Sequence, residues 1–218
     1  MTDIVKTKNQ MSLNLENLDP YAAFGIASQT APFLKFVKGV FKFGADDETL
    51  EIGTLLVPNM DELKSGFLKW DDGEPVGELM GLVGERKIPT RSDCGDLDHA
   101  LWPTDQNGDR KDPWQVVNTL PMKDINTSEQ YVYTTGSHGG ISAIGKLATQ
   151  YSRQRIHHRD QLPVIKIGTS SYRHKAYGDV AVPTFIIVKW VSEAELISGG
   201  TDGGGADLKD DLDDEIPM

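Results

Sequence analysis

The chain has 218 residues and a formal net charge of −11 at pH 7, from 22 Lys and Arg against 33 Asp and Glu. Its single cysteine excludes an intramolecular disulfide and fits a reducing compartment. The first 20 residues contain no apolar signal-peptide core, and no apolar run approaches the ~20 residues needed to cross a bilayer. We therefore expect a cytoplasmic protein that does not enter a membrane.

Composition divides the chain into three predicted segments. Residues 1–20 are polar and are expected to form a flexible lead-in, and residues 21–198 are long enough for one domain with its own core. Residues 199–218 are rich in glycine and contain seven Asp or Glu against one Lys, a net charge of −6. Such a segment buries too little apolar surface to offset its chain entropy, so we expect a disordered acidic tail.

Apolar and aromatic patterning predicts about eight short strands between residues 33 and 191. The stretch 33–43 has lysines at helical spacing, but its aromatic and valine residues favour a strand that bends at Gly39. Residues 84–113 are acidic and rich in turn residues, which predicts a loop. The other expected strands cover residues 49–57, 63–70, 77–83, 115–120, 130–135, 164–168 and 184–191.

One main helix is expected over residues 141–154, because Ile141, Ile144, Leu147 and Tyr151 share a face. The chain shows no internal repeat and no alternation of strands with helices that would build a parallel sheet. A mainly β fold follows, either a small barrel or a sandwich of antiparallel strands. The more specific expectation is an OB-like antiparallel β-barrel with long loops.

Charge is segregated along the chain. Residues 131–178 contain seven Lys or Arg and one acid, Asp160, whereas acids gather between residues 93 and 112. Single-stranded nucleic acids bind cationic grooves in which aromatic rings stack on bases. For Phe36 and Trp70, burial in the core is the competing interpretation. The candidate nucleic-acid contacts are Lys35, Phe36, Lys38, Lys42, Trp70, Lys146, Arg153, Arg155, Arg159 and, in an expected loop, Tyr172, Arg173 and Lys175.

Residues 140–146 match the G-x-x-x-x-G-K spacing of a phosphate-binding P-loop, with Lys146 in the lysine position, and they follow the glycine-containing turn 136–140. Leu147 stands where a Mg²⁺-binding Ser or Thr is required, so nucleotide hydrolysis is not expected. Two interpretations remain. The glycines make a tight turn into the helix, or the turn and helix N-terminus hold a DNA phosphate with Ser137 and His138 as donors. No catalytic residue, cofactor or metal site is predicted.

The chain ends in an acidic run closed by two apolar side chains, a proline and the terminal carboxylate, an ending that a pocket lined with Arg or Lys can capture. It resembles the C-terminal tip of bacterial and phage single-stranded DNA-binding proteins, where a flexible linker leads to Asp-Asp-Ile-Pro-Phe. Glu215 stands where that family has an Asp, and Met218 replaces its Phe. The resemblance covers six to eight positions, and the body resembles uncharacterised phage and prophage proteins. The residues that carry it are Asp213, Asp214, Glu215, Ile216, Pro217 and Met218.

The resemblance implies a sequence-independent single-stranded DNA-binding protein of phage or prophage replication or recombination, inside a bacterial host cell. Its tip would recruit partner enzymes of those processes, and homo-oligomer formation stays open. Without DNA, the acidic tail is expected to fold back on the basic groove. Two alternatives remain: a structural or interaction protein of a phage without DNA affinity, and a metal-dependent nuclease that uses carboxylates between residues 93 and 112, Asp96 among them.

Overall fold

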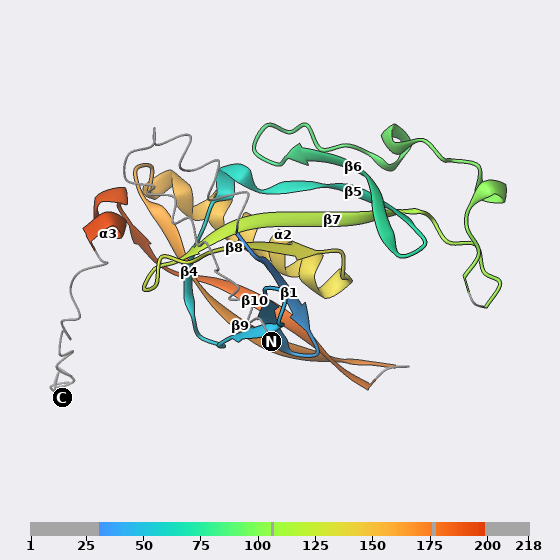
Figure 1. The fold of residues 1–218 in the computed structure, drawn as a ribbon. Coiled ribbons are helices and arrows are strands. Elements are labelled where there is room, and N and C mark those ends of the chain that lie inside the picture. The colour runs from blue at the N-terminus through green and yellow to red at the C-terminus, as the bar shows by residue number, and fades with distance from the viewer. Residues whose placement is uncertain (1–30, 106, 176–177, 199–218) are drawn as a thin grey trace, which may run out of the picture.

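The computed structural model describes residues 31–105, 107–175 and 178–198. Within these residues the prediction of a mainly β protein with one main helix is confirmed (Figure 1). The expected lead-in over residues 1–20 and the expected disordered tail over residues 199–218 lie outside the described residues. So do the expected partner-binding residues at the tip, Asp213, Asp214, Glu215, Ile216, Pro217 and Met218.

The strands are β1 (Phe33–Val37), β2 (Val40–Phe43), β3 (Glu48–Leu50), β4 (Leu55–Pro58), β5 (Lys64–Asp71), β6 (Glu74–Leu82), β7 (Trp114–Asp124), β8 (Gln130–Thr135), β9 (Leu162–His174) and β10 (Gly178–Val191). The α-helices are α2 (His138–Gln154) and α3 (Glu193–Ser198). Short 3₁₀ helices are η2 (Met60–Glu62), η3 (Arg91–Cys94), η4 (His99–Leu101) and η5 (Arg155–His157).

The first predicted strand is a hairpin, so the prediction of one bent strand over residues 33–43 is wrong. Val37 of β1 pairs with Val40 of β2, and the two residues between them, Lys38 and Gly39, have positive φ angles of 51° and 90°. Positive φ at both positions is typical of the two-residue turns that suit the twist of antiparallel strands. Residues 49–57 are likewise split, into β3 and β4.

The last two strands are longer than predicted. β9 and β10 pair from the core outward as far as His174 and Gly178. Tyr172 and Arg173 therefore lie in a strand, and the expectation of a loop there is wrong. Lys175 lies at the turn of the hairpin, as expected.

The strands join into one sheet in the order β10-β9-β4-β7-β8-β1-β2-β3, and the β5–β6 hairpin is added through β5 to β7. β1 and β8 are parallel, and the other described strand pairs are antiparallel. Among the described residues no ladder joins β3 to β10, so the sheet is not closed and the OB-like barrel is not confirmed. The sheet is nevertheless curved, because the ring centroids of Phe41 in β2 and Phe185 in β10 lie 5.9 Å apart across the core.

α2 packs along β10 and contributes Ala143, Ile144 and Leu147 to the main core. Gln150 of α2 also forms hydrogen bonds through its side-chain amide to the backbone of Ile187 in β10. The Nε2 atom donates to the Ile187 carbonyl at 3.5 Å, and the Oε1 atom accepts from the Ile187 N–H at 3.3 Å. These bonds pair backbone groups on an end strand of the sheet, where free groups invite unwanted strand pairing.

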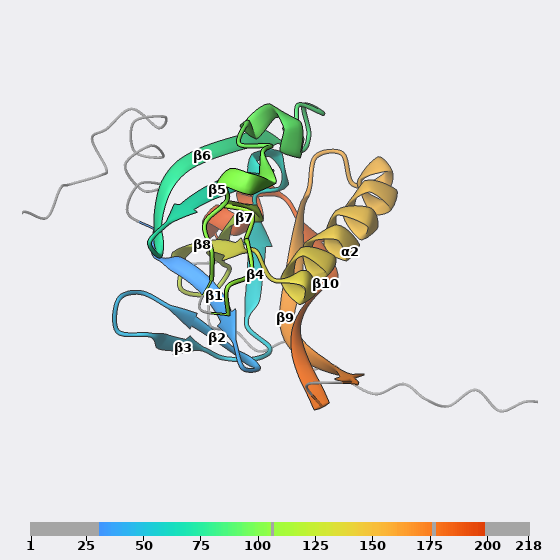
Figure 2. The same ribbon diagram turned by 90° about the vertical axis from the view of Figure 1, so that its right-hand side faces the viewer.

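Two arms project from the same side of the body (Figure 1). The acidic arm is residues 64–113, which contain 11 Asp or Glu against 7 Lys or Arg. The basic arm is the outer part of the β9–β10 hairpin, residues 169–175 and 178–182, with Arg173 and Lys175 against Asp179. Figure 2 looks onto this side and shows β1, β2 and β3 on one flank of the body and α2 on the other, with the basic arm reaching toward the viewer.

Candidate nucleic-acid interface

The outer face of the β1–β2 hairpin carries lysines between apolar side chains. Side chains alternate along a strand, and β1 turns Leu34 into the core while it exposes Phe33, Lys35 and Val37. Phe33 has 70% of its surface exposed. Lys42 of β2 lies opposite Lys35. The hairpin face is defined by Phe33, Lys35, Val37, Val40 and Lys42.

One carboxylate partly neutralises the hairpin face. Lys35 Nζ lies 2.7 Å from Asp47 Oδ1, and Lys42 Nζ lies 3.7 Å from Asp47 Oδ2. The hydrogen bond from Lys35 lowers the pKa of Asp47, so this carboxylate is charged at neutral pH. Two cations against one anion leave one net positive charge on the face. Exposed pairs of this kind add little to stability, so the lysines remain available to other anions.

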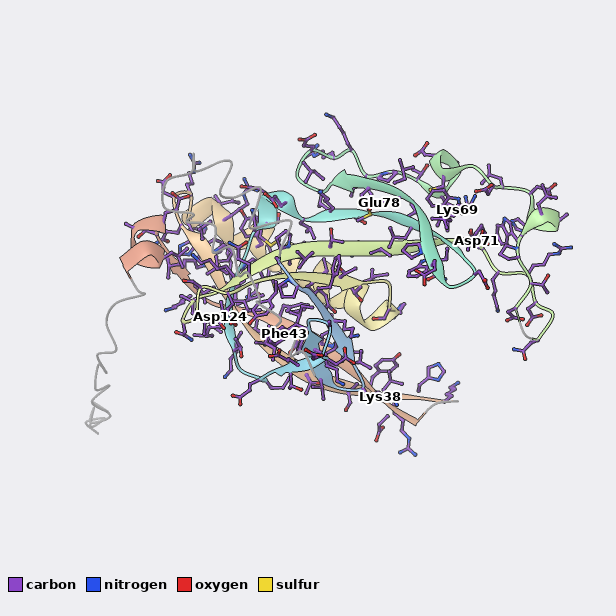
Figure 3. The ribbon with its side chains drawn as sticks, in the orientation of Figure 1. Lys38, Phe43, Lys69, Asp71, Glu78 and Asp124 are labelled. Carbon is purple, nitrogen blue, oxygen red and sulfur yellow. The ribbon has the colours of Figure 1, made fainter. Side chains whose placement is uncertain are left out.

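The turn of the hairpin rests against the basic arm. A Cβ atom placed on Gly39 would lie 3.5 Å from the Cβ atom of Ala181 in β10. Val180, the residue before Ala181, pairs with Tyr172 of β9. Lys38 therefore lies beside the arm, as Figure 3 shows. The structure brings together two groups of predicted contacts that are more than 100 residues apart in the sequence.

The basic arm offers one exposed ring and two exposed cations. Tyr172 is 45% exposed, and Arg173 and Lys175 are exposed as well. Asp179 lies opposite Arg173 in the strand register. In residues 31–198 as described, Lys38, Arg173 and Lys175 form no salt bridge. The basic surface is defined as the hairpin face together with Lys38, Tyr172, Arg173 and Lys175.

The other predicted cations lie on a second surface. Lys146 and Arg153, about two helical turns apart on α2, line a shallow hollow along the helix. Arg155 and Arg159 line a separate hollow beyond it with Tyr151, and the Arg155 guanidinium carbon lies 5.3 Å from the centre of the Tyr151 ring. Figure 2 shows α2 on the flank away from β1 and β2. The structure therefore does not bring these four cations to the hairpin face.

Two predicted aromatic contacts lie elsewhere. Phe36 packs edge-on against the buried Phe41, with ring centroids 4.9 Å apart. Trp70 is half-buried in the acidic arm, and its neighbour Lys69 forms a 2.8 Å ion pair with Asp96. The structure places Phe36 against the core and Trp70 in the arm that carries the excess of acids.

The acidic arm is organised by Arg91 and Asp96. Arg91 donates to both carboxylate oxygens of Asp112, at 2.7 and 2.8 Å. Asp96 accepts from Lys69 and from the indole of Trp114, each at 2.8 Å, and these bonds lower the pKa of Asp96. The carboxylate that the nuclease alternative names is thus engaged in holding the loop. The described part of the chain contains no group of three His, Cys, Asp or Glu placed to hold a metal ion.

The glycines before α2 have a packing role. A Cβ atom on Gly140 would overlap Thr135 Oγ1, and one on Gly139 would lie 2.5 Å from Val182 Cγ1. Ser137 Oγ accepts from the N–H of Gly140 at 3.1 Å and caps the helix, which begins three residues before the predicted start. The hydroxyl expected to donate to a phosphate thus accepts the capping bond, and it also lies 3.2 Å from Thr135 Oγ1, with which it can exchange a hydrogen bond.

Phe33 is the exposed ring that the sequence prediction missed. The sequence contains one signal for it, which is Lys35. Side chains two positions apart in a strand share a face, so a β1 that exposes Lys35 also exposes Phe33.

Comparisons of this chain with protein-family models, with curated proteins and with solved structures gave no match. Among the described residues, no helix is both long enough and apolar enough to cross a membrane. The functional assignment therefore depends on the geometry and charge of the surfaces described above.

Proposed function

We propose that this protein is a non-catalytic, sequence-independent single-stranded DNA-binding protein of phage or prophage replication or recombination, active in the bacterial cytoplasm. One observation carries the proposal. The fold joins the hairpin face, Lys38 and the basic arm into one surface with several cations and two exposed rings, while acids gather on the other arm. Such a polarised charge distribution draws a polyanion to one side of a protein.

The basic surface would hold a strand through its phosphates and its bases. Each Lys or Arg that neutralises a phosphate releases counterions, so affinity falls as salt rises. Phe33 and Tyr172 would offer ring faces, and each stacked base adds about 1–3 kcal/mol whatever its identity. At about 3.3 Å per residue, β1 from Phe33 to Val37 spans about 13 Å, enough for a few nucleotides. Lys146, Arg153, Arg155 and Arg159 would hold a strand that continues around the body.

The OB-like architecture belongs to the same proposal. An OB-fold is a partly open five-stranded barrel that binds oligonucleotides. Here β4 and β5 both pair with β7 and act as one bent strand, and β7, β8, β9 and β10 supply the other four. The unpaired seam would be between β8 and β10, where the ring centroids of Tyr133 and Phe185 lie 5.1 Å apart. This order supports an opened barrel from which the two arms extend as prolonged hairpins and connections.

The tail would connect the DNA complex to other enzymes. Its net charge of −6 suits competition with DNA for the basic surface, and its tip suits a cationic pocket on a partner. DNA binding would then release the tip formed by Asp213, Asp214, Glu215, Ile216, Pro217 and Met218.

The decisive measurement is fluorescence anisotropy of labelled oligo-dT and of a matched duplex, titrated with the full chain at low and moderate salt. We expect a preference of at least about 100-fold for the single strand, because stacking requires unpaired bases. We also expect affinity to fall with salt by a slope of about 0.7 for each phosphate contact on a log–log plot.

Equal or absent binding to the two DNAs would contradict the proposal and favour a structural or interaction protein. Divalent-metal-dependent loss of the labelled strand would favour the nuclease alternative, and the Asp96→Ala variant would then be inactive. The same titration with a non-nucleic polyanion such as heparin is the control for binding by charge alone.

Deletion of residues 199–218 is expected to tighten oligo-dT binding several-fold at low salt, because the deletion removes six net negative charges that compete for the basic surface. The gain is expected to vanish at high salt, where screening shortens the reach of the tail. Anisotropy of the full and shortened chains at two salt concentrations measures both. A shortened chain with unchanged low-salt affinity would remove the fold-back part and leave the DNA-binding proposal standing.

A further inference from the structure

A hollow of about 440 Å³ opens on the face of β4, β7 and β8 that is turned away from the core. Its size lies in the range typical of sites for small ligands. Part of its wall is apolar, from Val57, Pro121 and Val132. Asn59 and Gln130 also line it, and residues of this kind carry side-chain amides with both hydrogen-bond donors and acceptors. The hollow therefore combines an apolar wall with groups suited to the edge of a planar polar ring.

Two lysines stand at different ends of this hollow. Lys64 of β5 lies opposite Thr119 of β7. Lys123 lies four positions after Thr119 in β7, so about 13 Å of strand separates Lys123 from the position of Lys64. Neither lysine forms a salt bridge within the part of the chain that the structure describes. Glu62 is the one acid among the lining residues, so the rim carries a net positive charge. This arrangement suits an occupant with an apolar body and an anionic group on each side.

Phe33 connects the hollow to the hairpin face. Its backbone pairs with Val132, which lines the hollow, and its own exposed ring stands at the rim. Along β1 the same face continues through Lys35 to Val37 and then to Lys38 beside the basic arm. A strand held on the basic surface would therefore reach the hollow without crossing to another side of the molecule.

We propose that this hollow binds one unstacked nucleotide of the single strand, an inference that rests on the proposed function. The base lies against Phe33 and the apolar wall, and the amides of Asn59 and Gln130 meet its edge. The phosphates on either side of the nucleotide lie near Lys64 and Lys123. Charge and continuity with the basic surface favour a nucleotide over an apolar peptide as the occupant.

The test combines affinity with the position of the bound base. Phe33→Ala is expected to lower oligo-dT affinity about tenfold, as for the loss of one stacked base, whereas Phe33→Trp retains it. Lys123→Ala is expected to reduce the salt slope by about 0.7, the value of one phosphate contact. Ultraviolet cross-linking of oligo-dT with one 5-iodouracil, read by mass spectrometry, is expected to yield a peptide that contains Phe33.

The matched control is Val76→Ala, because Val76 is an apolar residue of β6 on the acidic arm, is 57% exposed, and belongs neither to the hollow nor to the basic surface. Its affinity for oligo-dT is expected to change less than about twofold, since it removes no stacking ring. If the wild-type protein binds oligo-dT and the Phe33→Ala and Lys123→Ala variants bind it with the same affinity and salt slope, the nucleotide site is overturned and the DNA-binding function stays intact. Absence of wild-type binding would overturn both.

A free peptide with the sequence of residues 213–218 tests the competing occupant. The probe is added to the chain shortened by residues 199–218, with and without Phe33→Ala. Peptide binding that depends on Phe33, together with oligo-dT binding that does not, would assign the hollow to the tip of the tail and overturn the proposal. Absence of peptide binding alongside the cross-link at Phe33 supports the nucleotide.

Discussion

Reversing the charge of Arg173 and Lys175 together, as Arg173→Glu with Lys175→Glu, is expected to weaken oligo-dT binding by about 100-fold at moderate salt. Both side chains are exposed on the basic arm and form no salt bridge among the described residues. Each substitution removes a phosphate contact and adds a repulsive charge, which we estimate at about 1.4 kcal/mol for each position. Anisotropy over a range of salt concentrations measures the loss and the shallower salt slope.

The control changes net charge by the same amount on the acidic arm. Lys87 and Lys111 are exposed and already paired with acids, Lys87 with Glu85 at 3.1 Å and Lys111 with Asp105 at 3.4 Å. Lys87→Glu with Lys111→Glu is expected to lower affinity less than about threefold, because charges beyond a Debye length of about 10 Å are screened. Equal losses in the two double variants would show that binding follows net charge and has no defined surface.

The same experiment separates the two cationic surfaces. Lys146→Glu with Arg153→Glu alters the outer side of α2 without touching the hairpin face. On the proposed interface this pair has a smaller effect than the pair on the basic arm, because the exposed rings lie beside the basic arm and the hairpin face. The opposite ranking would move the principal contact to α2. A circular-dichroism melt of each variant confirms that the fold is retained.

Strands with a clear composition and a clear end were predictable from the sequence. β8 matches its predicted range because it is rich in Tyr, Val and Thr, and β5 lies within one residue of its predicted range because the turn residues Asp72 and Gly73 follow it. The hairpin at Lys38 was not predictable in the same way, since it requires a lysine with positive φ, which side-chain sterics disfavour. Local residue preferences indicate a bend at Gly39, and they do not indicate the tight turn that the structure has there.

The basic arm was missed for a different reason. From residue 169 to residue 175 the chain reads Thr-Ser-Ser-Tyr-Arg-His-Lys, which has no buried face and so no alternating pattern. This part of β9 is a strand because its backbone pairs with β10. Such pairing depends on contacts between the two strands, and the hydrophobic periodicity of one segment does not predict it. Charge counting still identified Arg173 and Lys175, because charge needs no knowledge of the local conformation.

Which predicted contacts lie together depends on the topology. The parallel pairing of β1 with β8 joins residues about 100 positions apart and sets the hairpin beside the basic arm. It also leaves α2 and the segment that follows it, which together carry four of the nine predicted cations, on another flank of the body (Figure 2). A single groove was therefore the natural expectation from the sequence, and the fold distributes the same cations over two surfaces.

Gly140→Ala is expected to destabilise the protein by about 2–4 kcal/mol. A Cβ atom there would lie 2.8 Å from Thr135 Cβ and would overlap Thr135 Oγ1. A change of rotamer does not move Thr135 Cβ, so the backbone at the start of α2 must shift, and overpacking of this kind costs about 1–3 kcal/mol. The shift also strains the cap between Ser137 Oγ and the Gly140 N–H, which is worth about 1 kcal/mol. Urea unfolding followed by circular dichroism measures the loss.

Gly145→Ala is the matched control, because it lies in the same helix and a Cβ atom on Gly145 would meet nothing within 4 Å. Alanine is favoured over glycine in a helix interior by about 1 kcal/mol, so this variant is expected to be more stable than the parent protein. The pair decides what the P-loop-like spacing means. If Gly140→Ala lowers stability, Gly145→Ala raises it, and both folded variants keep the oligo-dT affinity of the parent protein, Gly140 serves helix packing. A Gly140→Ala protein of full stability that has lost affinity would instead assign the turn to phosphate binding.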